Sequence, residues 1–174
     1  DIRAKTTDCE ERRCTIIFDP AGEAFTQKTA KELAAYEQLI LICGHYEGFD
    51  ARVYDLADRL ISVGDFVLTG GEIPAMLVVD ATARMLPGVL GDDTSAPTDS
   101  FFDVLLGYPQ YTRPREFEGK SVPDVLLSGN HAEIARWRRE QSLLRTMRHR
   151  PELLPLAKLT TEDLLFLSKQ NEKW

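Results

Sequence analysis

Three glycine-containing loops carry the residue types most suited to ligand chemistry. They read DPAG (19–22), GHYEG (44–48) and SVGDFVLTGG (62–71), and each lies at or near the end of an apolar run of strand length. Glycine lets a ligand meet the backbone directly, because it has no Cβ. The loops contain no lysine or arginine, and the chain has neither a GK[ST] phosphate loop nor a GxGxxG after a first strand. Phosphate is therefore a poor ligand for these loops.

The same loops suit a flat heterocycle that carries a positive charge. Their apolar residues offer a wall, their glycines leave backbone groups accessible, and their acids supply negative charge. S-adenosylmethionine has the matching chemistry, since its adenine edge forms hydrogen bonds and its sulfonium attracts acids. Glycine turns in α/β proteins also have purely structural roles. The loops alone leave both interpretations open.

A parallel sheet would bring these loops together. Apolar, strand-length runs alternate with segments of helical composition, which is typical of an α/β domain with a parallel sheet. In such a sheet, ligands bind at the carboxyl ends of the strands. Thr26 is the expected N-cap of the first helix. We expect strands over 14–18, 39–43 and 61–68, and helices over 26–38, 50–60 and 71–86.

The rest of the chain has a different composition. Residues 91–104 are rich in Asp, Ser, Thr and Pro, as linkers are. A turn-rich stretch follows, and Asn130 with Glu133 predicts the start of a helix at about His131. A final helix is expected after Thr160 and Thr161. We therefore expect an incomplete first domain over 1–91, a linker over 92–104 and a mostly helical C-terminal domain over 105–174.

Charge divides the chain in the same way. The formal net charge is -7, yet residues 1–104 hold nine basic against nineteen acidic residues, and residues 105–174 hold twelve against nine. In the helix expected from His131, Ile134, Trp137 and Leu144 form the predicted apolar stripe, and the arginines point elsewhere. A basic end favours an anionic partner. A solvated helix face explains the same pattern equally well.

Composition excludes several classes of protein. With 43% hydrophobic and 28% charged residues, the chain is typical of a globular domain. No apolar run approaches the ~18 residues of a membrane span, and no signal-peptide pattern occurs. Its three cysteines lack the spacing of a metal site. We expect a cytoplasmic protein with no membrane partner.

Five segments carry a resemblance to a known family. In order, they are similar to signature segments of the bacterial tRNA (guanine-N1)-methyltransferases, which belong to the SPOUT class of knotted methyltransferases. The resemblance runs from about residue 14 to about residue 155. The segments read ICGHYEGFDARV, SVGDFVLTGGEIPAM, RMLPGVLG, DSFFDVLLGYPQYTRP and VPDVLLSGNHAEIARWRREQSLLRT.

The resemblance implies both a fold and a reaction. The fold is an α/β domain with a deep trefoil knot that cradles S-adenosylmethionine, followed by a small helical domain that grips tRNA. The reaction gives 1-methylguanosine at position 37, just 3′ of the anticodon. The family also implies a homodimer with its active site at the subunit interface, and Mg²⁺ is a candidate further partner. No acidic cluster in the sequence makes an all-protein cage for that ion, so no metal ligand is assigned.

The resemblance also implies the roles of individual residues. Asp99 and Arg84 match the family's catalytic positions, and the arginines that match its tRNA-binding part are Arg113, Arg138, Arg139, Arg145 and Arg148. The implied cofactor shell consists of Ile17, Phe18, Asp19, Pro20, Gly44, Glu47, Ser62, Val63, Gly64, Phe66, Val67, Leu68, Gly70, Gly71 and Pro74.

Guanine N1 becomes nucleophilic only after it loses its proton, so the implied reaction needs a base and a group that stabilises charge on O6. Asp99 suits the first role and Arg84 the second. Without the resemblance, Asp99 is typical of a turn and Arg84 of a helix end. Glu47 suits either a helix cap or a carboxylate near a sulfonium or a metal.

The chain also departs from the family pattern. His45 stands where many members have Arg, while Asp19 and Ala21 stand where many have Ser and Gln. The family's N-terminal segment with its GGG motif is absent from this sequence, so we expect weak cofactor binding or no activity from this chain alone. Two alternatives stay open: a catalytically incomplete tRNA-binding protein with the same fold, and a SPOUT ribose 2′-O-methyltransferase.

Overall fold

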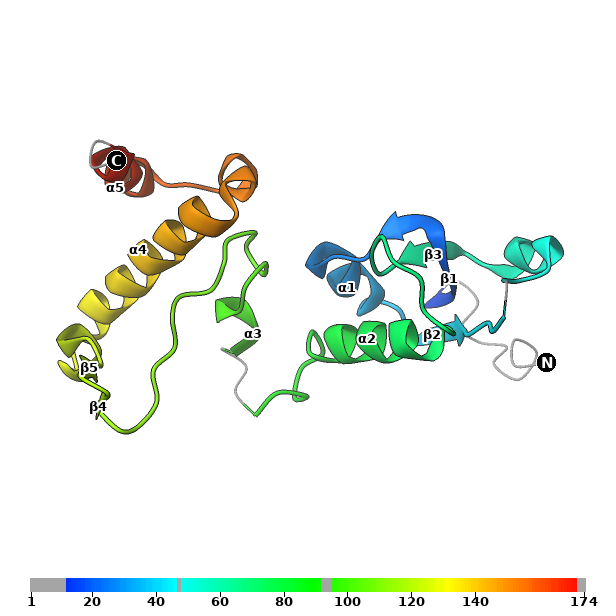
Figure 1. Ribbon diagram of the computed structural model, residues 1–174, viewed down its shortest axis with the longest axis horizontal. Coiled ribbons are helices and arrows are strands. Elements are labelled where there is room, and N and C mark those ends of the chain that lie inside the picture. The colour runs from blue at the N-terminus through cyan, green and yellow to red at the C-terminus, as the bar shows by residue number, and fades with distance from the viewer. Residues whose placement is uncertain (1–11, 47, 92–94, 172–174) are drawn as a thin grey trace. The chain divides into compact units, whose positions relative to one another are not determined.

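A parallel sheet of three strands organises the first of two units into which the chain divides. The units are residues 1–96 and 97–174. The computed structural model describes residues 12–46, 48–91 and 95–171. In the sheet, β1 (Arg13–Ala24) lies between β2 (Gln38–Ile42) and β3 (Arg59–Ser62), as Figure 1 shows. The predicted α/β class with a parallel sheet is confirmed.

The central place of β1 follows from its sequence. Cys14, Thr15, Ile16 and Ile17 are all buried, so β1 has no solvent-facing side over this stretch. A strand covered on both faces needs such a continuous run. In the parallel sheet, Ile17 of β1 pairs with Ile42 of β2, and Ile16 of β1 pairs with Arg59 of β3.

Two α-helices complete the core of this unit. They are α1 (Gln27–Leu33) and α2 (Glu72–Ala83), and a 3-10 helix, η3 (Ala51–Leu56), lies between β2 and β3 in the chain. Thr26 caps α1 as predicted, because its hydroxyl accepts a hydrogen bond from the Thr29 N–H at 3.3 Å. Leu33 of α1 and Val78 of α2 pack in one buried cluster with Cys14, Ile16 and Ile61.

The expected helix over 50–60 and strand over 61–68 are wrong in their bounds. Arg59 and Leu60 belong to β3, where the Arg59 side chain pairs with Glu23 at 2.6 Å and Glu32 at 3.1 Å. Beyond Ser62 the chain leaves the sheet at Gly64, whose φ of 148° interrupts regular strand geometry. The residues after it form a loop instead of a longer strand.

The turn expected at DPAG is also absent. Residues 19–22 lie inside β1, which continues to Ala24. The pairing with β3 shifts in register between Phe18 and Glu23, so these residues bulge from the ladder without ending the strand. The turn composition therefore marks an irregularity inside a strand.

The second unit is mostly helical. Its longest element is α4 (His131–His149), and Asn130 caps it by accepting a hydrogen bond from the Glu133 N–H at 3.4 Å. A short antiparallel hairpin, β4 (Glu116–Phe117) and β5 (Lys120–Ser121), precedes it. The other elements are α3 (Ser95–Thr98) at the boundary between the units, η4 (Asp124–Leu127), η5 (Pro151–Leu156) and α5 (Thr161–Asn171).

The buried face of α4 differs from the predicted stripe. Leu143 packs with Leu105 and with Leu167 of α5, while Ile134, Trp137 and Leu144 are only half-buried. Thr146 is fully buried, and its hydroxyl accepts a hydrogen bond from the Leu106 N–H at 3.0 Å. Apolar periodicity missed this face because a threonine occupies part of it. None of the helices in the described ranges is long and apolar enough to cross a membrane.

Candidate active site

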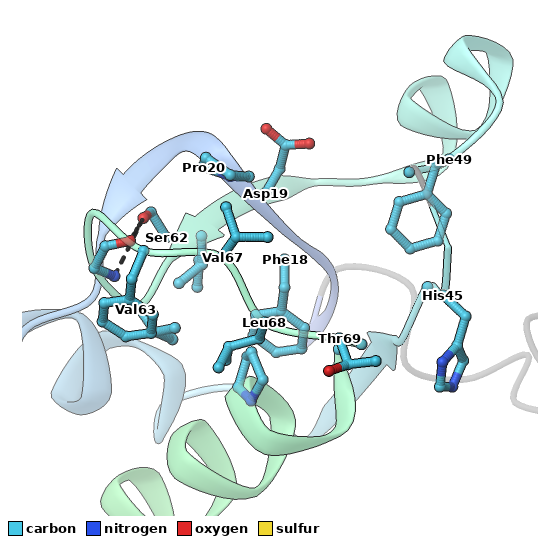
Figure 2. Close-up of a pocket in the computed structure, with 18 of the residues that line it drawn as sticks. Phe18, Asp19, Pro20, His45, Phe49, Ser62, Val63, Val67, Leu68 and Thr69 are labelled. Carbon is cyan, nitrogen blue, oxygen red and sulfur yellow. Dashed lines mark hydrogen bonds between the residues drawn. The ribbon is translucent and has the colours of Figure 1, made fainter.

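A cavity of about 320 Å³ opens in the unit 1–96, where β2 and β3 end. Three segments line it: part of β1, the loop after β2 and the loop that joins β3 to α2. Figure 2 shows Ser62, Val63, Val67 and Leu68 on one side of the site and His45 and Phe49 on another. The two glycine loops after β2 and β3 therefore meet at one place beside the DPAG segment of β1, because parallel strands present their carboxyl ends along one edge of a sheet.

Most positions of the implied cofactor shell line this cavity. Ile17 is buried inside β1 and does not line it, and Glu47 lies outside the described residues. Their roles in binding stay predictions. The thirteen that line it are Phe18, Asp19, Pro20, Gly44, Ser62, Val63, Gly64, Phe66, Val67, Leu68, Gly70, Gly71 and Pro74.

The two adjacent glycines hold the third loop against the second. The Gly71 N–H donates a hydrogen bond to the Gly44 carbonyl at 3.0 Å, and Gly70 forms an antiparallel bridge with His45. A Cβ on Gly71 would lie 2.7 Å from Cys43 Cα, closer than real side chains approach. A Cβ on Gly70 would first meet Glu72 and His45, at 2.5 Å and 2.9 Å. Close packing thus requires glycine at position 71, where the added Cβ would meet backbone, whereas at position 70 it would meet the ends of two side chains that can move.

Asp19 is the one carboxylate among the described residues that line the cavity. Of the residues that line it in the described part of the chain, none is lysine or arginine. The half-buried Asp19 carboxylate accepts hydrogen bonds from the Tyr54 hydroxyl and, at 2.8 Å, from the Ala21 N–H. This hydrogen bond to Asp19 raises the pKa of Tyr54 above its ordinary value. Such a site favours a ligand with a positive centre over a phosphate.

His45 pairs with a residue that sequence reasoning did not connect to it. Its Nε2 lies 2.6 Å from Oε1 of Glu72, in the first turn of α2. The pKa of Glu72 is lowered, first by its own backbone N–H and then by His45. An acid at a helix N-terminus after a glycine pair was the available signal. The pair links the loop after β2 to the first turn of α2.

Several other wall residues were also missed. Phe49 and Tyr54 line the cavity, and their rings pack edge to face with centroids 6.2 Å apart. No sequence motif predicts them as a pair, because η3 brings them together. The remaining lining residues outside the implied shell are Tyr46, Gly48, Ile61 and Thr69.

Comparisons with known proteins show the family to which the chain belongs. The family model described as "tRNA (Guanine-1)-methyltransferase TrmD" matches residues 2–156. A curated tRNA (guanine-N(1)-)-methyltransferase of Deinococcus radiodurans is 60% identical over 148 residues, which is 85% of this chain and 53% of that protein. The chain belongs to this methyltransferase family.

Other members of the tRNA (guanine-N1)-methyltransferase family show comparable identity. The Moorella thermoacetica protein is 60% identical over 155 residues, 88% of this chain and 62% of that protein. The protein of Lactobacillus delbrueckii subsp. bulgaricus is 53% identical over 171 residues, which is 98% of this chain and 70% of that protein. The chain thus spans between 53% and 70% of the length of these three relatives.

The two implied catalytic residues lie in different units. Arg84 follows the last turn of α2 and is half-buried. Its backbone N–H donates a hydrogen bond to the Asp80 carbonyl at 3.2 Å. Asp99 follows α3 and is exposed, and its carbonyl accepts the Phe102 N–H at 3.4 Å. Their catalytic roles stay predictions. In the described residues, no three His, Cys, Asp or Glu side chains gather as a metal site.

The five implied tRNA-binding arginines have different surroundings. Arg113 and Arg138 line a second cavity in the unit 97–174. Arg139 pairs with Asp163 at 2.7 Å, and Arg145 donates to the Gly107 carbonyl at 2.6 Å. Arg148 is exposed near the end of α4. The structure thus separates arginines with internal partners from arginines that face a cleft.

Proposed function

We propose that this chain transfers a methyl group from S-adenosylmethionine to N1 of guanine 37 in tRNA. The observation that carries the proposal is the cavity at the strand ends, where glycine backbone, apolar walls and Asp19 meet without lysine or arginine. Membership of the tRNA (guanine-N1)-methyltransferase family supports the reaction. The relatives carry that activity in their names, and the proposal extends it to this chain.

The cavity residues fit S-adenosylmethionine, which supplies an electrophilic methyl group when bound. Gly44, Gly70 and Gly71 line the cavity without side chains, so a ligand can approach the backbone there, and Phe66 and Val67 offer exposed apolar surface. Asp19 supplies negative charge for the positive centre. The same loops would form the SPOUT knot that the resemblance implies.

The chemistry on guanine falls to Asp99 and Arg84. Asp99 accepts the N1 proton, and the Arg84 guanidinium stabilises negative charge that develops on O6. The N1–H of neutral guanine is a much weaker acid than a carboxylic acid, so proton transfer to Asp99 needs help. Stabilisation of the developing charge on O6 by Arg84 favours the transfer, and so does exclusion of water from Asp99 under bound RNA.

The homodimer belongs to the same proposal. Four large apolar side chains of α2 are exposed in the chain by itself, namely Ile73, Met76, Leu77 and Val79, and Met76 is 71% exposed. An apolar helix face in water is costly, and a second copy of the chain would cover it. The active site would lie at that subunit interface. A cytoplasmic location follows from the tRNA substrate.

A methyl-acceptor assay on the 174-residue chain tests the proposal. We expect label from S-[methyl-³H]adenosylmethionine to enter an unmodified tRNA transcript with guanine at position 37, and nucleoside analysis to give 1-methylguanosine. A transcript with adenine at position 37 is the control and should gain no label. A 2′-O-methyl nucleoside would indicate the ribose methyltransferase instead. Bound tRNA without product would indicate the catalytically incomplete binding protein.

A further inference from the structure

A second cavity, of about 440 Å³, lies wholly within the unit 97–174. Residues 108–113, Arg115 and Val122 form one part of its lining, and η4 and α4 contribute the rest. Its lining includes Tyr108, Tyr111, Arg113 and Arg138. Aromatic rings beside arginines are the combination with which proteins hold unpaired nucleotides.

Arg138 is held in place by a ring and by no acid. Its guanidinium carbon lies 4.8 Å from the centroid of the Tyr108 ring, a cation–π contact. Among the described residues, it has no ion pair or hydrogen bond from its side chain. Its neighbours on α4 differ, since Arg136 pairs with Glu140 and Arg139 with Asp163. The donors of Arg138 therefore remain available to a ligand while Tyr108 limits its motion.

The other parts of the cleft complement this arginine. Tyr111 is 47% exposed, and its ring centroid lies 6.3 Å from that of Trp137. Arg113 also lines the cleft, and no acid partner for it exists in the part of the chain that the structure describes. Arg115 has such a partner, Asp124, at 2.9 Å. The cleft thus offers an exposed aromatic ring and two arginines without acids.

We propose that this cleft binds one unstacked nucleotide of the tRNA, away from the guanine that is methylated. The base stacks on Tyr111, and Arg138 and Arg113 contact the flanking phosphates. This inference rests on the proposed function, because it takes tRNA as the substrate. Stacking on a tyrosine face tolerates any base, so the cleft recognises an accessible nucleotide and not a particular sequence.

Matched variants separate stacking from charge. Affinity for an unmodified tRNA transcript is measured by fluorescence anisotropy at several salt concentrations. We expect Tyr111→Leu to weaken binding about tenfold with the same salt slope, because a stacking contact is lost and no charge changes. Tyr111→Phe, which keeps the ring, should bind within about twofold of wild type.

The charge variants use two arginines of the same helix. Arg138→Gln should weaken binding and reduce the salt slope by about one, since one phosphate contact is lost. Arg136→Gln is the control, because Arg136 is exposed, pairs with Glu140 and does not line the cleft. Equal losses of tRNA affinity in both variants would indicate a general attraction of tRNA to the charges of α4 and would overturn the proposal.

Photocrosslinking keeps the test valid if Tyr111→Leu does not fold. In wild-type protein, tRNA that contains 5-iodouridine should crosslink to Tyr111 or Trp137, as peptide mass spectrometry would reveal. If wild-type protein binds tRNA but crosslinks only at other residues, the cleft is rejected and the proposed function stands. The same holds if Tyr111→Leu and Arg138→Gln bind tRNA as tightly as wild type. Absence of both tRNA binding and methylation in wild type would reject the proposed function, and this inference with it.

Discussion

The guanidinium of Arg139 and the carboxylate of Asp163 form a two-point ion pair that joins α4 to α5. Nη2 lies 2.7 Å from Oδ2, and Nε lies 3.1 Å from Oδ1. Asp163 is only 5% exposed and also accepts the Thr160 N–H at 2.9 Å. A buried carboxylate needs such partners, because its transfer from water is costly. Arg139 is therefore engaged in the structure of this unit, although the resemblance implied a role in tRNA binding.

Replacement of Arg139 should weaken the fold of residues 97–174. We expect Arg139→Gln to lower the free energy of unfolding by about 2 kcal/mol, because the buried carboxylate loses its charged partner. Arg136→Gln, which breaks only the exposed pair with Glu140, should cost about 0.5 kcal/mol or less. Urea denaturation followed by tryptophan fluorescence measures both, since Trp137 and Trp174 belong to this unit. Equal losses would show that the ion pair contributes little.

Acid should destabilise the same unit through Asp163. Arg139 holds the pKa of Asp163 below its ordinary value of 3.8, with further help from Thr160. A carboxyl whose pKa is lowered by folding contributes stability above its unfolded pKa and loses it as the pH falls through the folded value. We expect the urea midpoint of the fluorescence transition to fall below about pH 4. Arg139→Gln should show a shallower fall there, and an identical fall would contradict this assignment.

The close approach of Gly71 to β2 predicts a packing defect. Gly71→Ala would place a Cβ 2.7 Å from Cys43 Cα, and backbone must move to admit it. We expect a loss of about 1–3 kcal/mol in the unfolding of the unit 1–96, as for other overpacked sites. Gly91→Ala is the control, because nothing lies within 4 Å of its added Cβ. Far-UV circular dichroism in urea compares the two variants, and equal stability would exclude this close contact.

The acid in the first cavity predicts a charge effect on the methyl donor. We expect Asp19→Asn to weaken S-adenosylmethionine binding roughly five- to tenfold, about 1 kcal/mol, since one partly exposed attraction is lost. Calorimetry with S-adenosylhomocysteine, which lacks the sulfonium, locates the charge. An effect on the donor alone places Asp19 near the sulfonium, and an equal effect on both places it near the amino group. Unchanged affinity for both ligands would remove Asp19 from the site.

Asp99 should affect the rate without affecting donor affinity. Asp99→Asn keeps the shape of the side chain but cannot accept the N1 proton. We expect single-turnover methylation of tRNA to fall about 10²–10⁴-fold, as when other general bases are removed. Affinity for S-adenosylmethionine and tRNA should stay within a few-fold.

Two other outcomes for Asp99→Asn would each change the assignment. Turnover within a few-fold of wild type would mean that the proton goes to another group, and Glu47 would be tested next. Loss of donor binding would instead place Asp99 in the cofactor shell. Arg84→Gln should likewise reduce the rate, because charge on O6 is no longer stabilised.

Local chemistry of the sequence was enough for much of the fold. The apolar run from Cys14 to Ile17 predicted a buried strand, and Thr26 and Asn130 predicted the starts of two helices. These signals depend on residues within one turn or one strand, so the sequence displays them directly. The glycine loops predicted a ligand site, and residues of all three glycine-containing segments line one cavity.

Only the tertiary structure decided which distant residues meet. Pairing with β1 placed Arg59 in a strand where local composition predicted a helix. The contacts of His45 with Glu72 and of Arg139 with Asp163 join residues 27 and 24 positions apart, and no local pattern specifies them. Long-range partners are chosen by packing and by the burial of charge, which depend on the whole unit. For the same reason, nothing in the sequence distinguished Arg138 from Arg139. In the fold, Arg138 lines a cleft and Arg139 forms an internal ion pair with Asp163.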